Sequence, residues 1–289
     1  MLEVLNAPLR AAYGEDSYSA SELRNWLTSP KVDPKRDIRL AEEDGRVIGY
    51  VDVDPLGSDP VRWWSDVRVH PDADVPAVAP ELLKWAEARA GSGIVRVWTA
   101  SLLEEMREAY EAAGFRPTRH SFRMAIELAG EPETPTWPAG ISVRSFRPGD
   151  EQVVYDAVNE TWVDTWQPME DSYEEWAHWS YDREDFDPSL WFLAFDGEDA
   201  AGFSLCQPSE TRADTGWVNL LGVRRPWRRR GLGEALLRHS FVEFRRRGFP
   251  RAGLGVDAES PTGATRLYER AGMRVDRRTD FYEKELSGR

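Results

Sequence analysis

The sequence predicts an α+β protein of two similar domains in tandem, each a mixed, mostly antiparallel twisted sheet flanked by helices. Strand-like and helix-like hydrophobic periods alternate along the chain. The segment Tyr110-Glu-Ala-Ala-Gly114 is echoed by Tyr268-Glu-Arg-Ala-Gly272, which indicates an internal repeat. A proline-rich stretch between the echoes is typical of an extended linker. We therefore expect an N-terminal domain at 1–130, a linker at 131–140 and a C-terminal domain at 141–289.

The first half has the weaker pattern of elements. Its opening strand is hard to identify, because only Leu2–Leu5 precedes Pro8 with strand character. Apolar residues at helical spacing predict helices over 79–86 and 102–113. The remaining short apolar runs predict strands at 47–53, 64–69, 95–99 and 121–128.

The second half reads as a full domain. It begins with a strand at 141–144, and Asp196-Gly197 marks the turn of a later hairpin. Gly272 is a plausible left-handed end for the last helix. The other predicted elements are helices at 151–166, 172–181, 236–244 and 264–271, and strands at 191–195, 201–207, 217–223, 254–257, 273–275 and 281–286.

The turn between the strand 217–223 and the next helix is rich in arginine and glycine. It lies at a helix N-terminus, where the first amides lack internal partners and the helix dipole favours an anion. Gly231 and Gly233 let these amides approach a phosphate without a Cβ in the way, and neighbouring arginines add positive charge. The sequence thus predicts a phosphate site here, and the alternative is an ordinary helix start with a solvated basic face.

The spacing Arg228-x-x-Gly231-x-Gly233 matches neither the P-loop nor the dinucleotide-binding signature. With the preceding Leu-Gly-Val and Pro226 it resembles the acyl-CoA motif of GNAT acetyltransferases. The downstream run Ala264-x-x-Leu267-Tyr268-x-x-x-Gly272-Met273 resembles that family's second motif, in the expected order. The whole chain is therefore similar to a tandem GNAT N-acetyltransferase with a layout like that of the mycothiol synthases.

The resemblance implies acetyl-CoA as cosubstrate. It implies that the backbone N–H of Leu221 polarises the thioester carbonyl. Tyr268 occupies the position of the general acid that protonates the leaving thiolate. The alternative for Tyr268 is a core tyrosine on an apolar helix stripe. The residues expected at the acetyl-CoA site are Leu221, Gly222, Val223, Arg228, Arg229, Arg230, Gly231, Leu232, Gly233 and Glu234.

The general base is not evident from the sequence. Trp217 stands where mycothiol synthases carry a catalytic carboxylate, and Pro261 replaces an asparagine common in the second motif. The base must therefore come from elsewhere or be dispensable, with Asn219 as a possible holder of a water molecule. Each candidate carboxylate also reads as a solvated surface charge: Asp164, Glu170, Asp171, Glu210 and Asp214.

The first copy lacks the features of the phosphate site. Alignment of the two helices places Asp74 opposite Arg228, and Ala77 and Ala79 opposite the two glycines. A carboxylate and two Cβ atoms at these positions argue against acyl-CoA binding. We expect a structural role for this copy.

Composition narrows the function classes. The chain of 289 residues has net charge −14. The segment from Arg224 to Arg251, however, contains ten arginines and only two acidic residues, Glu234 and Glu243. Nucleic-acid binding is one interpretation of this cluster, but the net negative charge of the whole chain disfavours a long polyanion.

Cys206 is the single cysteine and is expected to be a buried strand residue, and no metal-ligand spacing is present. No apolar run reaches the roughly 20 residues of a membrane span, so we expect a cytoplasmic protein with no membrane partner.

The expected reaction is direct attack of a small-molecule primary amine on acetyl-CoA in a ternary complex, by a monomer whose two copies pair like a dimer. The competing class is a non-catalytic acyl-CoA-binding or scaffold protein. Thirteen tryptophans allow either an aromatic acceptor pocket for a flat or cationic amine or an aromatic core. Those expected near the acceptor are Trp162, Trp166, Trp176, Trp179 and Trp191.

Overall fold

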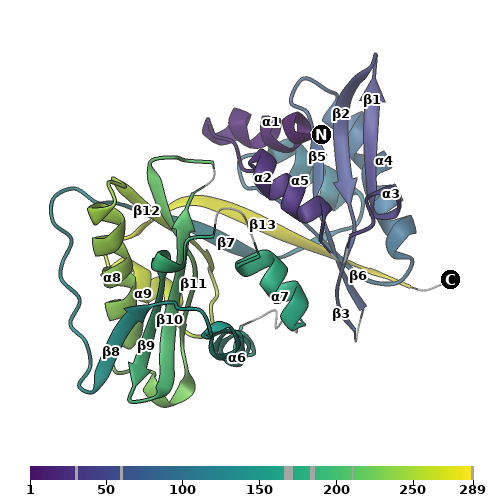
Figure 1. The fold of residues 1–289 in the computed structure, drawn as a ribbon. Helices are drawn as coiled ribbons and strands as arrows, with labels where there is room; N and C mark the ends of the chain where they lie inside the picture. Colours follow the sequence, from purple (N-terminus) through teal and green to yellow (C-terminus); the bar gives the residue numbers. More distant parts are fainter. Residues whose placement is uncertain (30–31, 59–60, 166–171, 183–185, 210, 288–289) are drawn as a thin grey trace. The chain divides into compact units, whose positions relative to one another are not determined.

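The chain folds into two compact units (Figure 1). Unit 1 contains Met1–His120 and Arg278–Arg289, and unit 2 contains Ser121–Arg277. This division differs from the expected boundaries at 130 and 141, because strands β7 (Arg116–Glu127) and β13 (Arg274–Leu286) each have residues in both units. The computed structural model describes residues 1–29, 32–58, 61–165, 172–182, 186–209 and 211–287.

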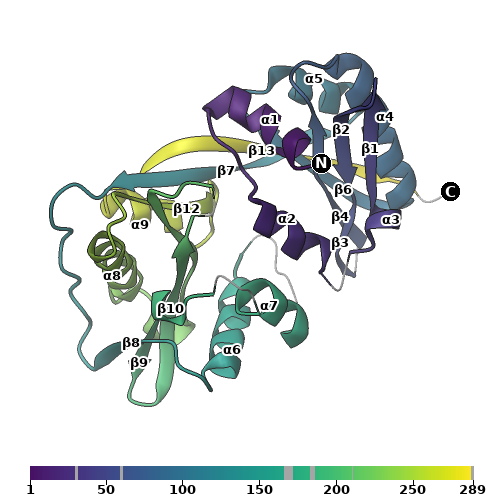
Figure 2. The same cartoon turned by 45° about the horizontal axis from the view of Figure 1, so that its top comes forward.

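Unit 1 has helices on two sides of its strands. Helices α4 (Val75–Ala90) and α5 (Glu104–Ala112) pack with Val51 in one core. Helices α1 (Leu2–Tyr13) and α2 (Ala20–Leu27) pack with Tyr50 in another, so they cover the opposite face (Figure 2). The remaining elements are α3 (Pro34–Asp37), β1 (Ile38–Glu43), β2 (Arg46–Asp52), β3 (Asp54–Ser58), β4 (Val61–Ser65), β5 (Val67–Val69) and β6 (Gly93–Ala100).

The chain begins with a helix. The Leu2–Leu5 segment, the one candidate for an opening strand, belongs to α1, which continues through Pro8 to Tyr13. Val4, Leu5 and Leu9 are buried at helical spacing, and this burial stabilises the helix despite the proline.

Unit 2 is a sheet in the order β7-β12-β11-β10-β9-β8 with helices on both faces (Figure 1). Its pairs are antiparallel except that of β11 with β12. Helices α8 and α9 pack in one core with Val218 and Leu254, and α6 and α7 pack in the other with Leu193 and Phe203. The bounds are β8 (Ile141–Ser145), α6 (Glu151–Trp162), α7 (Tyr173–Ser180), η1 (Pro188–Leu190), β9 (Trp191–Asp196), β10 (Asp199–Pro208), β11 (Thr215–Val223), η2 (Arg225–Trp227), α8 (Leu232–Arg246), β12 (Arg251–Asp257) and α9 (Ala264–Arg270).

The end of the chain is one strand rather than the two expected. β13 runs without a break from Arg274 to Leu286. No glycine or proline lies between Val275 and Phe281, so nothing in that segment forces a turn. Among the described helices, none is long and apolar enough to cross a bilayer.

The tryptophans expected near the acceptor mostly form core. Trp176 and Trp191 are buried between α6, α7 and the sheet, and Trp162 packs against the same cluster. Trp179 is 36% exposed, and Trp166 lies outside the described residues. The aromatic-core reading therefore accounts for three of the five side chains.

Candidate active site

A wedge opens between the two parallel strands of unit 2. β11 pairs with β12 only from Thr215 opposite Arg251 to Val218 opposite Leu254. Beyond this point β11 stays paired with β10, and β12 stays paired with β7 as far as Asp257. In the described sheet, the edge of β11 that faces β12 therefore has no strand partner after Val218.

The backbone of Leu221 points into this wedge. The amide N–H of Arg224 donates to the carbonyl oxygen of Ala201 on β10, at 3.0 Å. Since bonded pairs alternate along an antiparallel ladder, Gly222 also faces β10, whereas Leu221 and Val223 face away from it. The carbonyl of Val223 accepts a hydrogen bond from Nε of Arg228 at 2.8 Å, which agrees with this direction. The N–H of Leu221 is thus placed to donate to a ligand in the wedge.

Gly222 keeps β11 close to its neighbours. A Cβ at this position would lie 2.3 Å from Cζ of the buried Phe203 ring. We expect Gly222→Ala to lower the free energy of unfolding by about 1–3 kcal/mol, because the core must shift to admit a methyl group. Denaturant unfolding measures this effect, with Gly255→Ala as the control, because nothing lies within 4 Å of that Cβ position. Equal stability of the two variants would contradict the prediction.

The start of α8 has free backbone donors beside the wedge. Its N-cap is Gly231, in the left-handed region at φ 84°, and no side chain caps the helix. Among the described residues, the helical ladder begins with the bond from the N–H of Ala235 to the carbonyl oxygen of Gly231, so the amides of Leu232, Gly233 and Glu234 precede it. An anion is favoured here by these amides and by the helix dipole.

We call the turn 224–231 and the first amides of α8 the cradle, and its arginines fall into two groups. Arg225 and Arg228 both pair with Asp164, at 2.7 and 2.6 Å. Arg229 and Arg230 are exposed, and neither has an ion pair to the residues that the structure describes. The backbone of Arg229 is in the left-handed region at φ 59°, which is uncommon for a residue other than glycine. The two exposed arginines are therefore better placed than Arg228 to meet a phosphate.

The carboxylate of Glu234 is paired within unit 2. It pairs with Arg238 at 3.0 Å and with Arg270 at 3.6 Å, so the negative charge is neutralised by side chains of α8 and α9.

Tyr268 is a buried tyrosine with an uncommitted hydroxyl. It lies on α9, is 8% exposed, and packs in the core beneath α8. Its hydroxyl makes no hydrogen bond within the described part of the chain. Burial raises the pKa of Tyr268 to about 12, so the phenol stays protonated at every physiological pH.

The equivalent tyrosine of unit 1 is committed to the fold. The Tyr110 hydroxyl lies 3.0 Å from the carbonyl oxygen of Trp98 on β6 and 3.4 Å from that of Val67 on β5. These contacts join two strands that correspond to β12 and β11. The guanidinium of Arg68 stacks on Trp98 at 3.8 Å, and side chains therefore fill this part of unit 1.

The helix start of unit 1 is also closed to anions. The carboxylate of Asp74 caps α4 by accepting a hydrogen bond from the N–H of Ala77 at 3.1 Å. Pro76 has no N–H to offer. A carboxylate at this helix start repels a phosphate, whereas the start of α8 carries a glycine.

The structure separates the candidate bases. The Arg225 and Arg228 guanidiniums lower the pKa of Asp164 to about 2, which makes it a poor proton acceptor. The pKa of Asp214 is lowered by a hydrogen bond from Thr215 and by Arg212. Asn219 is exposed and forms the bulge of β11 where the wedge begins. Glu170, Asp171 and Glu210 lie outside the described residues.

Trp217 lies flat beside the wedge. Its ring covers Gly253 of β12, where a Cβ would come within 2.7 Å of the indole. The guanidinium of Arg123 on β7 lies 5.1 Å from the ring centre. From the sequence, Trp217 was notable only because it replaces a carboxylate. Its contact with Arg123, 94 positions earlier in the chain, could not be predicted from a local pattern.

Cys206 is not a nucleophile in this arrangement. It is 2% exposed, its sulfur lies near the hydroxyls of Ser204 and Ser240, and burial raises the pKa of its thiol to about 11. No cluster of metal-ligating side chains occurs among the residues described.

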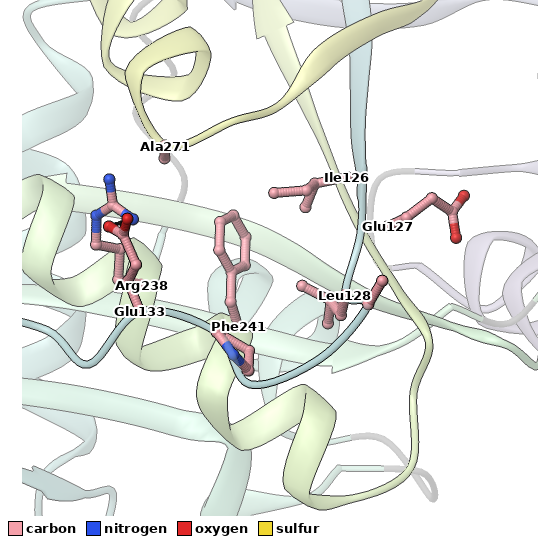
Figure 3. A pocket seen from close by; sticks show the side chains of 9 residues that line it. Ile126, Glu127, Leu128, Glu133, Arg238, Phe241 and Ala271 are labelled. Carbon is pink, nitrogen blue, oxygen red and sulfur yellow. Dashed lines mark ion pairs between the residues drawn. The ribbon is translucent and has the colours of Figure 1, made fainter.

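A small pocket lies on the α8 side of unit 2, and its lining contains no residue of β11 (Figure 3). Its volume of about 190 Å³ is below the range of roughly 300–1,000 Å³ usual for ligand pockets. Arg238 and Glu133 form an ion pair across it. We assign it no role in the reaction. Its lining residues are Ile126, Glu127, Leu128, Ala129, Pro132, Glu133, Arg238, Phe241 and Ala271.

Comparison with known proteins supports the assignment of both motifs. The family model of the Acetyltransferase (GNAT) family matches residues 1–115 and 152–273. A mycothiol acetyltransferase of Actinosynnema mirum is 31% identical over 239 residues, which cover 81% of this chain and 79% of the relative.

Comparison with solved structures also indicates a GNAT fold. A GCN5-related N-acetyltransferase from Sphaerobacter thermophilus is 34% identical, with a TM-score of 0.78 over 98% of this chain and 91% of that one. A tandem GNAT protein from the clavulanic acid biosynthesis pathway shares the fold at 15% identity, with a TM-score of 0.70 over 98% and 93% of the two chains. The chain therefore belongs to the GNAT acetyltransferase family, as a tandem acyltransferase that uses an acyl-CoA.

Proposed function

We propose that the chain transfers an acetyl group from acetyl-CoA to a primary amine of a small molecule, by direct attack in a ternary complex. The wedge between β11 and β12 carries this proposal, because it leads directly to the uncapped start of α8. The pyrophosphate would bind the amides of Leu232, Gly233 and Glu234, with charge from Arg229 and Arg230. The thioester would lie in the wedge, at the N–H of Leu221.

Two groups of this site act on the thioester and on the leaving thiolate. The N–H of Leu221 donates to the thioester oxygen and stabilises the negative charge that develops on it. The amine nitrogen bonds to the carbonyl carbon, the carbon–sulfur bond breaks, and the electron pair leaves with sulfur. Tyr268 gives its proton to the thiolate, the amine releases one proton to water, and the Tyr268 phenolate regains a proton from water. The products are an N-acetyl amine and free CoA.

Acetyl transfer is expected to accelerate as the pH rises. The Tyr268 pKa is raised to about 12, so the acid keeps its proton across the range from pH 6 to pH 10. Asp164 and Asp214 are paired and have lowered pKa values, so we expect neither to act as the base and the free amine form to set the rate. With an alkyl amine of pKa about 10, kcat/KM for the acceptor is expected to rise nearly tenfold per pH unit between pH 6 and pH 9. A plateau beginning near pH 7 would instead reveal a general base.

The acceptor of the named relatives is not carried over. The mycothiol acetyltransferases match over most of this chain, but Trp217 occupies the strand position where that layout places a carboxylate. We therefore leave the acceptor open to primary amines, and we propose one active site, in unit 2.

Release of free thiol from acetyl-CoA in a broad panel of primary amines tests this proposal. We expect thiol release to match N-acetyl product, measured by mass spectrometry, for at least one amine. A panel with no thiol release above slow hydrolysis would contradict acetyl transfer to an amine. An acetylated protein isolated after acetyl-CoA alone would contradict direct attack.

A further inference from the structure

A flat surface of unit 2 lies beside the wedge, on the sheet face opposite α8. Trp217, Gly253 and Ala125 are aligned across β11, β12 and β7, and Gly255 is aligned with Arg123. The alternate residues of β12, Ala252 and Leu254, are buried in the α8 core, so these five point to the other face. We call this surface the acceptor floor: Arg123, Ala125, Trp217, Gly253 and Gly255.

The acceptor floor is open where the wedge begins. Nothing lies within 4 Å of the Cβ position of Gly255, whereas the ring of Trp217 covers Gly253. Pairing of β11 with β12 ends at Leu254, so Gly255 is the first residue of β12 beside the wedge. An amine that attacks a thioester held at Leu221 can approach over Gly255, and the rest of its molecule would lie over the acceptor floor.

Guanidinium groups border the acceptor floor. Arg123, Arg251 and Arg277 lie 3.7, 3.8 and 3.5 Å from the carboxylate of Asp276. Arg251 also pairs with Glu127 at 2.8 Å. The Arg123 side chain is 19% exposed and stacks 5.1 Å from the ring of Trp217. These contacts place three guanidinium groups around one carboxylate at the border of the acceptor floor.

We propose that the acceptor is an amine that also carries a carboxylate, and that Arg123, stacked on Trp217, binds that carboxylate. This inference rests on the proposed function and names its substrate class. A guanidinium can bind a carboxylate through two parallel N–H donors, and the indole surface holds the guanidinium in one plane. An amine or a neutral polar molecule offers no such match.

The test compares the twenty standard amino acids with their amides, in which the carboxylate is neutralised and the amine kept. Binding to the CoA-loaded protein is measured by calorimetry, and thiol release from acetyl-CoA is measured in parallel. We expect at least one amino acid to exceed its amide at least tenfold in affinity and in kcat/KM. Arg123→Gln should abolish this difference, because the affinity and kcat/KM for the amino acid should fall to the level of its amide.

Arg39→Gln is the matched control, since Arg39 stacks on Trp85 in unit 1 at 5.4 Å and lies outside the candidate site. It should leave the preference intact. Equal values for acids and amides, or no binding of either to the CoA-loaded protein, would overturn the inference. Acetyl-CoA binding, measured in the same samples, distinguishes failure of this inference from failure of the proposed function. If the natural chain does not bind acetyl-CoA, the proposed function is overturned as well.

Discussion

Tyr268→Phe is expected to lower kcat by about 100-fold, with little change in stability or in acetyl-CoA affinity. The loss falls at the lower end for a general acid, because a phenol of pKa about 12 gives up its proton reluctantly. Stability should hold, since the Tyr268 hydroxyl makes no hydrogen bond to the described residues and the phenyl ring keeps its place in the core. Rapid-quench kinetics with saturating acetyl-CoA and thermal unfolding measure the two effects.

Tyr110→Phe is the matched control within the same chain. It removes the same hydroxyl from the equivalent position of unit 1, where the group contacts the carbonyls of Trp98 and Val67. We expect the free energy of unfolding to fall by about 1–3 kcal/mol and kcat to stay unchanged. If Tyr268→Phe costs stability but not rate, the tyrosine is a core residue and the acid must be sought elsewhere.

Gly231→Asp is expected to weaken acetyl-CoA binding by about 100-fold or more. The new carboxylate would stand at the start of α8, as Asp74 does at the start of α4. A negative charge about 4 Å from a phosphate costs roughly 4 kcal/mol near a protein surface, and every 1.4 kcal/mol is tenfold in affinity. The fold should survive, since aspartate is among the residues tolerated at positive φ and favoured at a helix start.

Gly231→Asn separates charge from bulk. Asparagine has nearly the same shape, and it also tolerates the left-handed conformation of φ 84° found here. We expect its acetyl-CoA affinity to stay within about tenfold of the natural value, because no charge is added. Equal losses in both variants, measured by calorimetry, would show that steric exclusion rather than repulsion explains the effect.

Local patterns predicted most of the elements of unit 2. Apolar spacing placed β11, α8 and α9 close to their observed bounds, and the glycines of the turn correctly indicated an uncapped helix start. Such features depend on neighbours a few residues apart, which a sequence displays directly. In unit 1, Ser19 and Glu22 form the capping box of α2, and their spacing is also a pattern that a sequence displays.

Contacts between distant residues could not be predicted. No residue near Asp164 in the sequence indicates that it pairs with Arg225 and Arg228. Because of this pairing, Asp164 is a partner of the cradle arginines rather than a candidate base. β13 is one continuous strand with residues in both units. Its pairing with β6, some 180 residues earlier in the chain, could not be predicted from local patterns. The Tyr110 contacts are likewise set by tertiary packing, so the repeat alone could not separate the two tyrosines.

Calorimetric titration of the natural chain with acetyl-CoA tests the central claim most directly, because it counts the binding sites. We predict one site per chain, in unit 2, since Asp74 and the contacts of Tyr110 close the equivalent places in unit 1. Two sites per chain would contradict this account of unit 1. Absence of binding would contradict the assignment of the wedge and cradle as the acetyl-CoA site.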